Sequence, residues 1–155
     1  MEVMTEERIK KYIGIQPRID KLSEQLRPLR EKAEDCSAHF QDAGYVKTYR
    51  KTDKVARNAT LIASYSNDIK ILEREKAIIE YFVLRIQCVN PMLANIIEYR
   101  FYDRWPISKI YSTLKRILNN NAPSESSIRR YIKEAFKNHG IFEYPASKDY
   151  NGENE

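Results

Sequence analysis

The chain has few glycines and cysteines, and both shortages limit the folds and the kinds of binding site that it can form. Only 4 of its 155 residues are glycine, and its many Glu, Lys, Arg, Ile and Leu residues favour helices over strands. No glycine-rich loop that would cradle a phosphate group is present. The two cysteines, Cys36 and Cys88, stand alone, without a CxxC spacing or an adjacent histidine. This pattern is typical of reduced thiols in a cytosolic protein.

Signals for catalysis and for membranes are also missing. His39 and His139 are isolated, and no Ser/His or Cys/His pair has supporting residues around it. We therefore expect no enzyme activity, no metal site and no cofactor. No apolar run approaches the roughly 18 residues of a membrane span, and the N-terminus lacks the apolar centre of a signal peptide. The sequence predicts a cytoplasmic protein that does not engage a membrane.

Charge is abundant and unevenly distributed. The chain is 32% charged and 42% hydrophobic, with a net charge of +5. Between Pro106 and His139 there are seven basic residues and two acidic ones, whereas the residues from Gly140 onward are net acidic. Mild overall basicity permits nucleic-acid binding without requiring it. Its concentration in one segment makes that segment the candidate binding region.

Two amphipathic patterns predict a long helical hairpin over residues 1–89 that acts in oligomerisation. A short helix is expected first, ending at Gly14, and Pro28 is expected to kink or shorten the helix that follows. The connection near Gly44 leads to a second helix that is expected from Asp53. The second half of the connection could also be part of that helix. The first apolar seam has the three-four spacing of a coiled coil and contains Ile19, Leu22, Leu26, Leu29, Ala33 and Cys36.

The second helix is expected to run from Asp53 to Val89, about 55 Å at 1.5 Å per residue. A helix of that length needs the first seam, another subunit, or both, to cover its apolar stripe, so we expect a homodimer. Lys76 within the seam either extends its amine to solvent or fixes the register and number of subunits. The predicted oligomerisation seam comprises Ile62, Tyr65, Ile69, Leu72, Lys76, Ile79, Val83 and Ile86.

Shorter patterns after Asn90-Pro91 predict three compact helices over residues 90–140, in the layout of a helix-turn-helix domain. The fold class is therefore all-α: a long helical hairpin or coiled coil followed by a three-helix domain. Residues 141–155 are expected to form an acidic, flexible tail.

The last of these helices is predicted over residues 124–138, with Ser124 as its N-cap. Its apolar face comprises Ile128, Tyr131, Ile132, Ala135 and Phe136. Polar residues in the first turns of such a helix reach base edges in the major groove, and long basic residues contact phosphates. The candidates for reading bases are Glu125, Ser126, Ser127, Arg129, Arg130 and Lys133. The candidates for phosphate contact are Lys109, Lys115, Arg116, Ser124 and Lys137. A solvated basic face on a structural helix is the competing interpretation.

Two stretches carry a resemblance to known families. The sequence "LANIIEYRFYDRWPISKIYSTL" followed by "SESSIRRYIKEAF" resembles the C-terminal helix-turn-helix of sigma factors. It is more closely similar to phage late-gene transcriptional regulators of the RinA and ArpU kind. The similar part extends from about Pro91 to His139. It departs from the pattern at Tyr111, where a small residue is usual, and at Arg104, where glycine is common. The span from Leu114 to Ser127 is also longer than a standard turn, so "KRILNNNAP" must lengthen the second helix or enlarge the loop.

The resemblance implies a sequence-specific DNA-binding regulator, an activator of phage late genes in a bacterial host cell. Double-stranded DNA would be its partner, and its long helices offer a surface for RNA polymerase or an inhibitor. One alternative is a small terminase subunit for DNA packaging, which would form a ring of eight or more copies. Another is a coiled-coil adaptor whose basic lobe binds an acidic protein.

Overall fold

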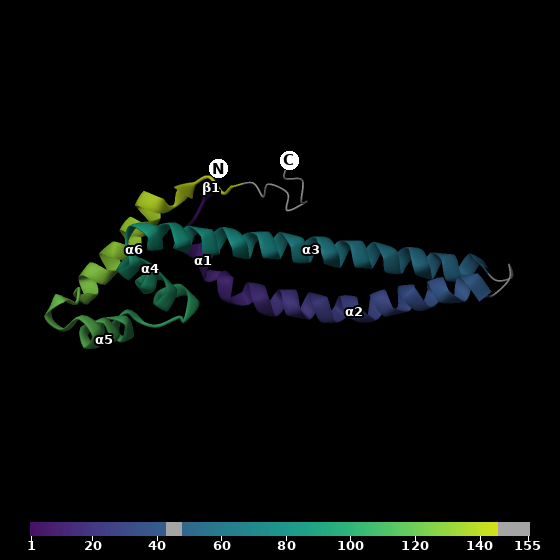
Figure 1. Ribbon diagram of the computed structural model, residues 1–155, viewed down its shortest axis with the longest axis horizontal. Helices are drawn as coiled ribbons and strands as arrows, with labels where there is room; N and C mark the ends of the chain where they lie inside the picture. Colours follow the sequence, from purple (N-terminus) through teal and green to yellow (C-terminus); the bar gives the residue numbers. More distant parts are fainter. Residues whose placement is uncertain (43–47, 146–155) are drawn as a thin grey trace, which may run out of the picture. The chain divides into compact units, whose positions relative to one another are not determined.

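The computed structural model describes residues 1–42 and 48–145, and the side chains of residues 35–53 lie outside the description. The fold is all-α, as predicted, with one small pair of strands in the described part of the chain. Figure 1 shows a pair of long helices and a group of shorter ones. The helices are α1 (Glu6–Lys10), α2 (Tyr12–Asp42), α3 (Thr48–Val89), α4 (Pro91–Ile97), α5 (Ile107–Leu118) and α6 (Glu125–His139).

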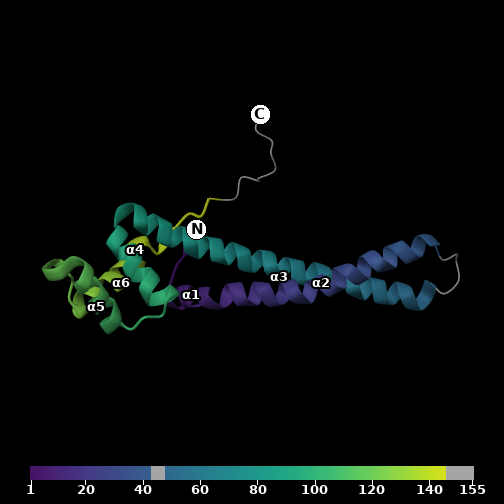
Figure 2. The same cartoon turned by 60° about the horizontal axis from the view of Figure 1, so that its bottom comes forward.

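The long helices α2 and α3 lie side by side in both views (Figures 1 and 2). α3 ends at Val89, as predicted, but it begins at Thr48 rather than Asp53. The expectation that Pro28 shortens its helix is wrong, because α2 continues through Pro28 to Asp42. The expected stop at Gly14 is also wrong: the break between α1 and α2 falls at Lys11. One unfavourable glycine costs about 1 kcal/mol in a helix, which the rest of α2 can offset.

The chain divides into two compact units. Gly14–Glu75 form one unit, and Met1–Ile13 together with Lys76–Glu155 form the other. The sequence pattern predicted a boundary at residue 89, whereas the last turns of α3 belong to the unit of the C-terminal helices. The reason is their composition: Ile79, Phe82 and Ile86 are completely buried.

The core of that second unit is aliphatic and aromatic. Phe82 of α3 stacks on Phe136 of α6 with ring centroids 5.4 Å apart, and Phe101 meets the same ring edge-on at 5.5 Å. Phe101 lies in η1 (Glu98–Tyr102), a π-helical turn that continues directly from α4. Other side chains that are fully buried in this unit are Ile9, Ile96, Ile97, Ile110 and Ile128.

A two-stranded ribbon joins the ends of this unit. β1 (Glu2–Val3) pairs antiparallel with β2 (Ile141–Phe142), and Val3 lies opposite Ile141. The Met4 N–H donates to the Gly140 carbonyl at 2.6 Å, and Phe142 is buried. The flexible tail was predicted to begin at residue 141, but these residues are part of the folded unit. Residues 146–155 of the predicted tail lie outside the described residues.

Within the described ranges, no helix combines the length and the apolar character that crossing a membrane requires.

Candidate nucleic-acid interface

The beginning of α6 is fixed by two serines. The Ser124 hydroxyl accepts from the Ser127 backbone N–H at 3.2 Å and donates to the Ser127 hydroxyl at 3.0 Å. Ser124 has an extended backbone, φ −67° and ψ 163°, as an N-cap residue does. The predicted cap is therefore confirmed. Ser127 stands at the position of the capping-box glutamate, but its hydroxyl accepts from the Ser124 hydroxyl, whereas a capping-box glutamate accepts from the N-cap backbone N–H.

One face of α6 is held against the core. Ile128, Ile132 and Ala135 are buried, and Phe136 stacks on Phe82 and meets Phe101 edge-on. Tyr131 is half-buried. The predicted apolar face is thus confirmed for the whole set. Because this face is packed along the length of the helix, the direction of the opposite face is fixed by the fold.

The opposite face of α6 is exposed and basic. Five exposed residues fall within a band about 100° wide at 3.6 residues per turn: Ser126, Arg129, Arg130, Lys133 and Lys137. Arg130 lies 3.8 Å from Glu134, but both side chains are more than half exposed, and such surface pairs contribute little. The guanidinium of Arg130 therefore remains available to a ligand. Of the other base-reading candidates, Glu125 and Ser127 are half-buried, and the Ser127 hydroxyl is engaged in the cap.

The basic residues of α5 divide between two sides of that helix. Lys109 and Arg116 are seven residues apart and share one side, whereas Lys115 points about 120° away from them. All three are exposed. The Lys109 amine lies 4.2 Å from the centre of the Trp105 ring, and the Lys115 amine lies 5.8 Å from that of Tyr111. Both amines are thus placed over aromatic faces that limit their motion.

The connection between α5 and α6 shows how the extra residues between Leu114 and Ser127 are accommodated. α5 continues to Leu118, and η2 (Asn119–Asn121), a single 3-10 turn, follows it. Asn119 has φ 54° and ψ −122°, a positive-φ conformation that glycine adopts more readily than other residues. The extra residues therefore both lengthen the second helix and enlarge the turn. The basic end of α5 leads through this turn directly to the start of α6.

The turn before α5 is built on an aromatic stack that sequence reasoning missed. The Trp105 ring lies 4.6 Å from that of Tyr99 and nearly parallel to it. The Trp105 backbone N–H donates to the Tyr99 carbonyl at 2.9 Å, and the Arg100 guanidinium donates to the Trp105 carbonyl at 3.1 Å. Arg104 has φ 53°, a backbone conformation that favours glycine over other residues.

The predicted oligomerisation seam is buried at one end and open at the other. Ile79, Val83 and Ile86 are buried within the unit of the C-terminal helices. The remaining five, Ile62, Tyr65, Ile69, Leu72 and Lys76, are half-exposed. Lys76 lies 4.0 Å from Glu80, so its amine has an acidic neighbour one turn further along α3.

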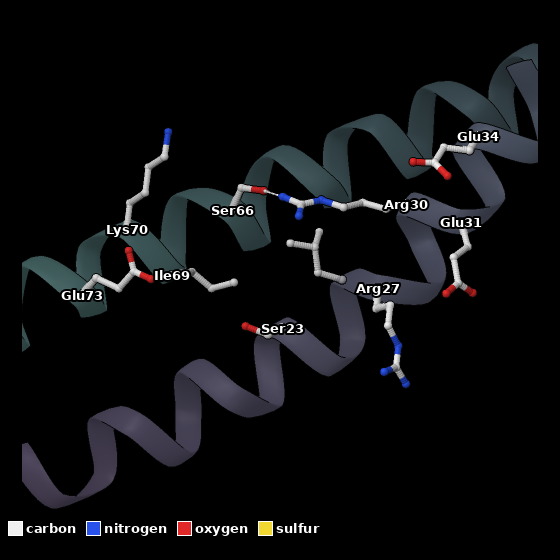
Figure 3. A pocket seen from close by; sticks show the side chains of 10 residues that line it. Ser23, Arg27, Arg30, Glu31, Glu34, Ser66, Ile69, Lys70 and Glu73 are labelled. Atoms are coloured by element: carbon white, nitrogen blue, oxygen red, sulfur yellow. Dashed lines mark hydrogen bonds between the residues drawn. The ribbon is translucent and has the colours of Figure 1, made fainter. Parts of the chain in front are cut away.

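A groove of about 500 Å³ opens beside the exposed part of the seam, within Gly14–Glu75. Figure 3 shows Ile69 pointing between α2 and α3, whereas Arg27 and Lys70 point away. The Arg30 guanidinium donates to the Ser66 hydroxyl at 3.5 Å across the groove. The charged residues that line the groove are Arg27, Arg30 and Lys70 against Glu31, Glu34 and Glu73, with no net charge.

Cys88 is exposed and carries a free thiol, and the Cys36 side chain lies outside the described residues. Among the described residues, no group of three or more His, Cys, Asp or Glu side chains is arranged to hold a metal ion.

Comparison with known proteins yields no assignment: no family model, curated protein or solved structure matches the chain.

Proposed function

We propose that the chain is a sequence-specific regulator of transcription that reads double-stranded DNA with α6. The observation that carries this proposal is the exposed basic band on a helix whose opposite face is packed into the core. A rigidly held helix with Arg129 and Arg130 near its start presents two planar donor groups that suit guanine edges or phosphates. Arg116 and Lys109 on the preceding helix supply further phosphate contacts.

The competing interpretation, a solvated basic face on a structural helix, explains the exposure equally well. It does not explain why the basic residues of α5 and α6 occur together with contacts that hold both helices in place. Those contacts are the serine cap of α6 and the aromatic rings beneath the lysine amines of α5. A reading helix needs a fixed direction, because base edges are recognised at hydrogen-bond distance. We therefore favour DNA binding, with no catalytic role and no cofactor.

The long helices support a homodimer in this proposal. The groove beside the half-exposed seam has three basic and three acidic residues, so its charge does not repel a second copy of the chain. A symmetric dimer would recognise half-sites separated by about 34 Å or a multiple of it. In keeping with the resemblance to phage late-gene regulators, we propose that it acts as an activator, with RNA polymerase as a further partner.

Enrichment of bound duplexes from a random pool tests sequence-specific reading. The wild-type chain should enrich a two-fold symmetric sequence, and Arg129→Ala/Arg130→Ala should lose that enrichment while its circular dichroism spectrum stays unchanged. Retention of the same motif by this variant would show that α6 does not read DNA.

A further inference from the structure

A second surface of the same unit has the opposite chemistry to α6. A shallow groove of about 560 Å³ is lined by side chains from the first residue of α2, the last turns of α3, η1 and the segment after β2. Its aromatic walls are four tyrosines: Tyr12, Tyr81, Tyr102 and Tyr144. The rings of Tyr12 and Tyr102 stack 4.1 Å apart, and Tyr81 and Tyr144 meet edge to face at 5.4 Å.

The charged residues that line this groove are both acidic, Glu80 and Glu98. Glu80 accepts from the Tyr12 hydroxyl at 2.7 Å, while the rest of its carboxylate is half exposed. Lys76 lies 4.0 Å from Glu80, one turn away on the same helix, and does not line the groove. The groove is therefore an anionic, aromatic surface on a chain whose net charge is positive.

Two of the groove tyrosines have raised pKa values because of their burial and the nearby carboxylates. Burial, together with the hydrogen bond to Glu80, raises the pKa of Tyr12 to about 12. Burial also raises the pKa of Tyr102, and the nearby Glu80 and Glu98 carboxylates add to the effect. The Tyr102 hydroxyl is itself covered and has no hydrogen-bond partner among the described residues. A donor that enters the groove would find the two carboxylates, one of which already accepts from Tyr12.

We propose that this groove binds an arginine side chain from a basic segment of a partner protein. A guanidinium matches both features of the surface, because its plane stacks on aromatic rings and its edge donates two hydrogen bonds to a carboxylate. The exposed side chain of Leu84, 53% accessible, offers an apolar contact for the rest of the arginine stem.

Other occupants fit this surface less well. Nucleic acid is repelled by the two carboxylates, and an acidic peptide is repelled in the same way. A purely apolar segment would remove water from the Glu80 and Glu98 carboxylates without bringing a cation, which is costly. Lysine supplies the charge but has no planar group that stacks on a ring and bridges a carboxylate.

Short synthetic peptides test the proposal directly. The probe is an acetylated, amidated Gly-Arg-Gly-Arg-Gly peptide, titrated into the full chain without DNA while the tyrosine ring resonances are followed by NMR. Binding should shift the rings of the four groove tyrosines. The same peptide with citrulline, which is neutral and nearly the same shape, should produce no shift. A lysine peptide should bind several-fold more weakly than the arginine peptide.

Two variants locate the binding. Glu80→Gln/Glu98→Gln should weaken the arginine peptide at least about tenfold, since each charge-assisted hydrogen bond that is lost contributes about that factor. The matched control, Glu7→Gln/Asp103→Asn, removes the same charge from exposed positions outside the groove and should bind as the wild-type chain does. Leu84→Arg changes an exposed side chain, so it should keep the fold and abolish binding by placing a cation in the groove.

The proposal would be overturned if citrulline and arginine peptides bound equally, or if the groove and control variants lost the same affinity. Duplex affinity provides an independent readout. Glu80→Gln/Glu98→Gln and its control Glu7→Gln/Asp103→Asn should bind DNA equally. The peptide and DNA measurements therefore test the two proposals separately.

Discussion

Individual glycines in this fold have opposite roles. A side chain at Gly140 would collide with the Phe136 carbonyl and lie 2.9 Å from the Met4 carbonyl, where β1 approaches the end of α6. At Gly14, an exposed residue inside α2, an added Cβ meets nothing within 4 Å. The close approach of backbone to backbone explains why residue 140 must be glycine, whereas residue 14 has no such constraint.

We expect Gly140→Ala to lower the free energy of unfolding by roughly 1–3 kcal/mol, because the collision must be relieved by moving backbone. Gly14→Ala should raise the free energy of unfolding by about 0.5–1 kcal/mol through helix propensity. Urea unfolding at one fixed protein concentration measures both. Equal effects from the two substitutions would contradict the approach of Met4 to the end of α6.

Arg104 is a second residue at which the backbone conformation, and not the side chain, should determine the effect of a substitution on stability. Its φ of 53° costs an L-residue about 1–2 kcal/mol, and the side chain is exposed. Arg104→Gly should therefore raise the free energy of unfolding by about 0.5–1 kcal/mol after the extra freedom of the unfolded chain is counted.

The neighbouring Asp103, with φ −90°, provides the control for Arg104. Asp103→Gly should be neutral or destabilising in the same urea titration, because its backbone gains nothing from glycine. Destabilisation by Arg104→Gly would contradict the left-handed conformation at that position.

At the scale of elements, α6 depends on its serine cap. Ser124→Ala removes the acceptor for the Ser127 N–H and should lower the free energy of unfolding by about 1 kcal/mol. Ser126→Ala, in the same turn but outside the cap, should change the free energy by no more than about 0.5 kcal/mol. Thermal unfolding followed by circular dichroism compares the two variants. A larger loss from Ser126→Ala would place the helix start elsewhere.

The elements differ in how well the sequence predicts them. α6 and its cap were predictable because Ser124 stands immediately before a clear apolar period, and the end of α3 was predictable because Asn90-Pro91 follows it. Pro28 and Gly14 misled the prediction, since local propensity is outweighed by the amphipathic pattern of the whole of α2. The β1–β2 ribbon was not predictable, because two-residue strands have no period and their partners lie at opposite ends of the chain.

Of the two candidate binding surfaces, one could be predicted from the sequence and the other could not. The exposed basic band on α6 follows from helical periodicity alone, so each of its members was found in the sequence. The tyrosine groove was missed, because it gathers residues that are as far apart as Tyr12 and Tyr144 and only the tertiary fold brings them together. The four tyrosines share no spacing in the sequence that could have indicated a groove.

At the scale of the whole molecule, we expect a dimer formed through the open part of the seam. Light scattering should give twice the chain mass of 18.3 kDa. Ile69→Glu should give the mass of a monomer with an unchanged circular dichroism spectrum, because it places a charge in the seam. A loss of helix signal would show instead that Ile69 stabilises the contact between α2 and α3 within one chain. The matched variant Ile71→Glu changes a side chain that is already 58% exposed and should remain dimeric.

Other masses would contradict this proposal. A monomeric wild-type chain would mean that the seam is not covered by a second copy of the chain. A mass of eight or more subunits would favour a DNA-packaging ring. Lys76→Leu separates the two roles of that residue: a changed number of subunits indicates that Lys76 sets the register, and an unchanged mass indicates that its amine is merely solvated.

Duplex affinity measured across a range of salt concentrations tests the central claim most directly. Fluorescence anisotropy would compare the wild-type chain, Arg129→Ala/Arg130→Ala, and the control Arg18→Ala/Lys21→Ala, which removes the same charge from exposed positions of α2. The α6 variant should bind at least about tenfold more weakly, and its slope of log affinity against log salt should fall by about one to two. The control should keep nearly the full affinity and slope. Equal losses in the two variants would contradict DNA binding by α6.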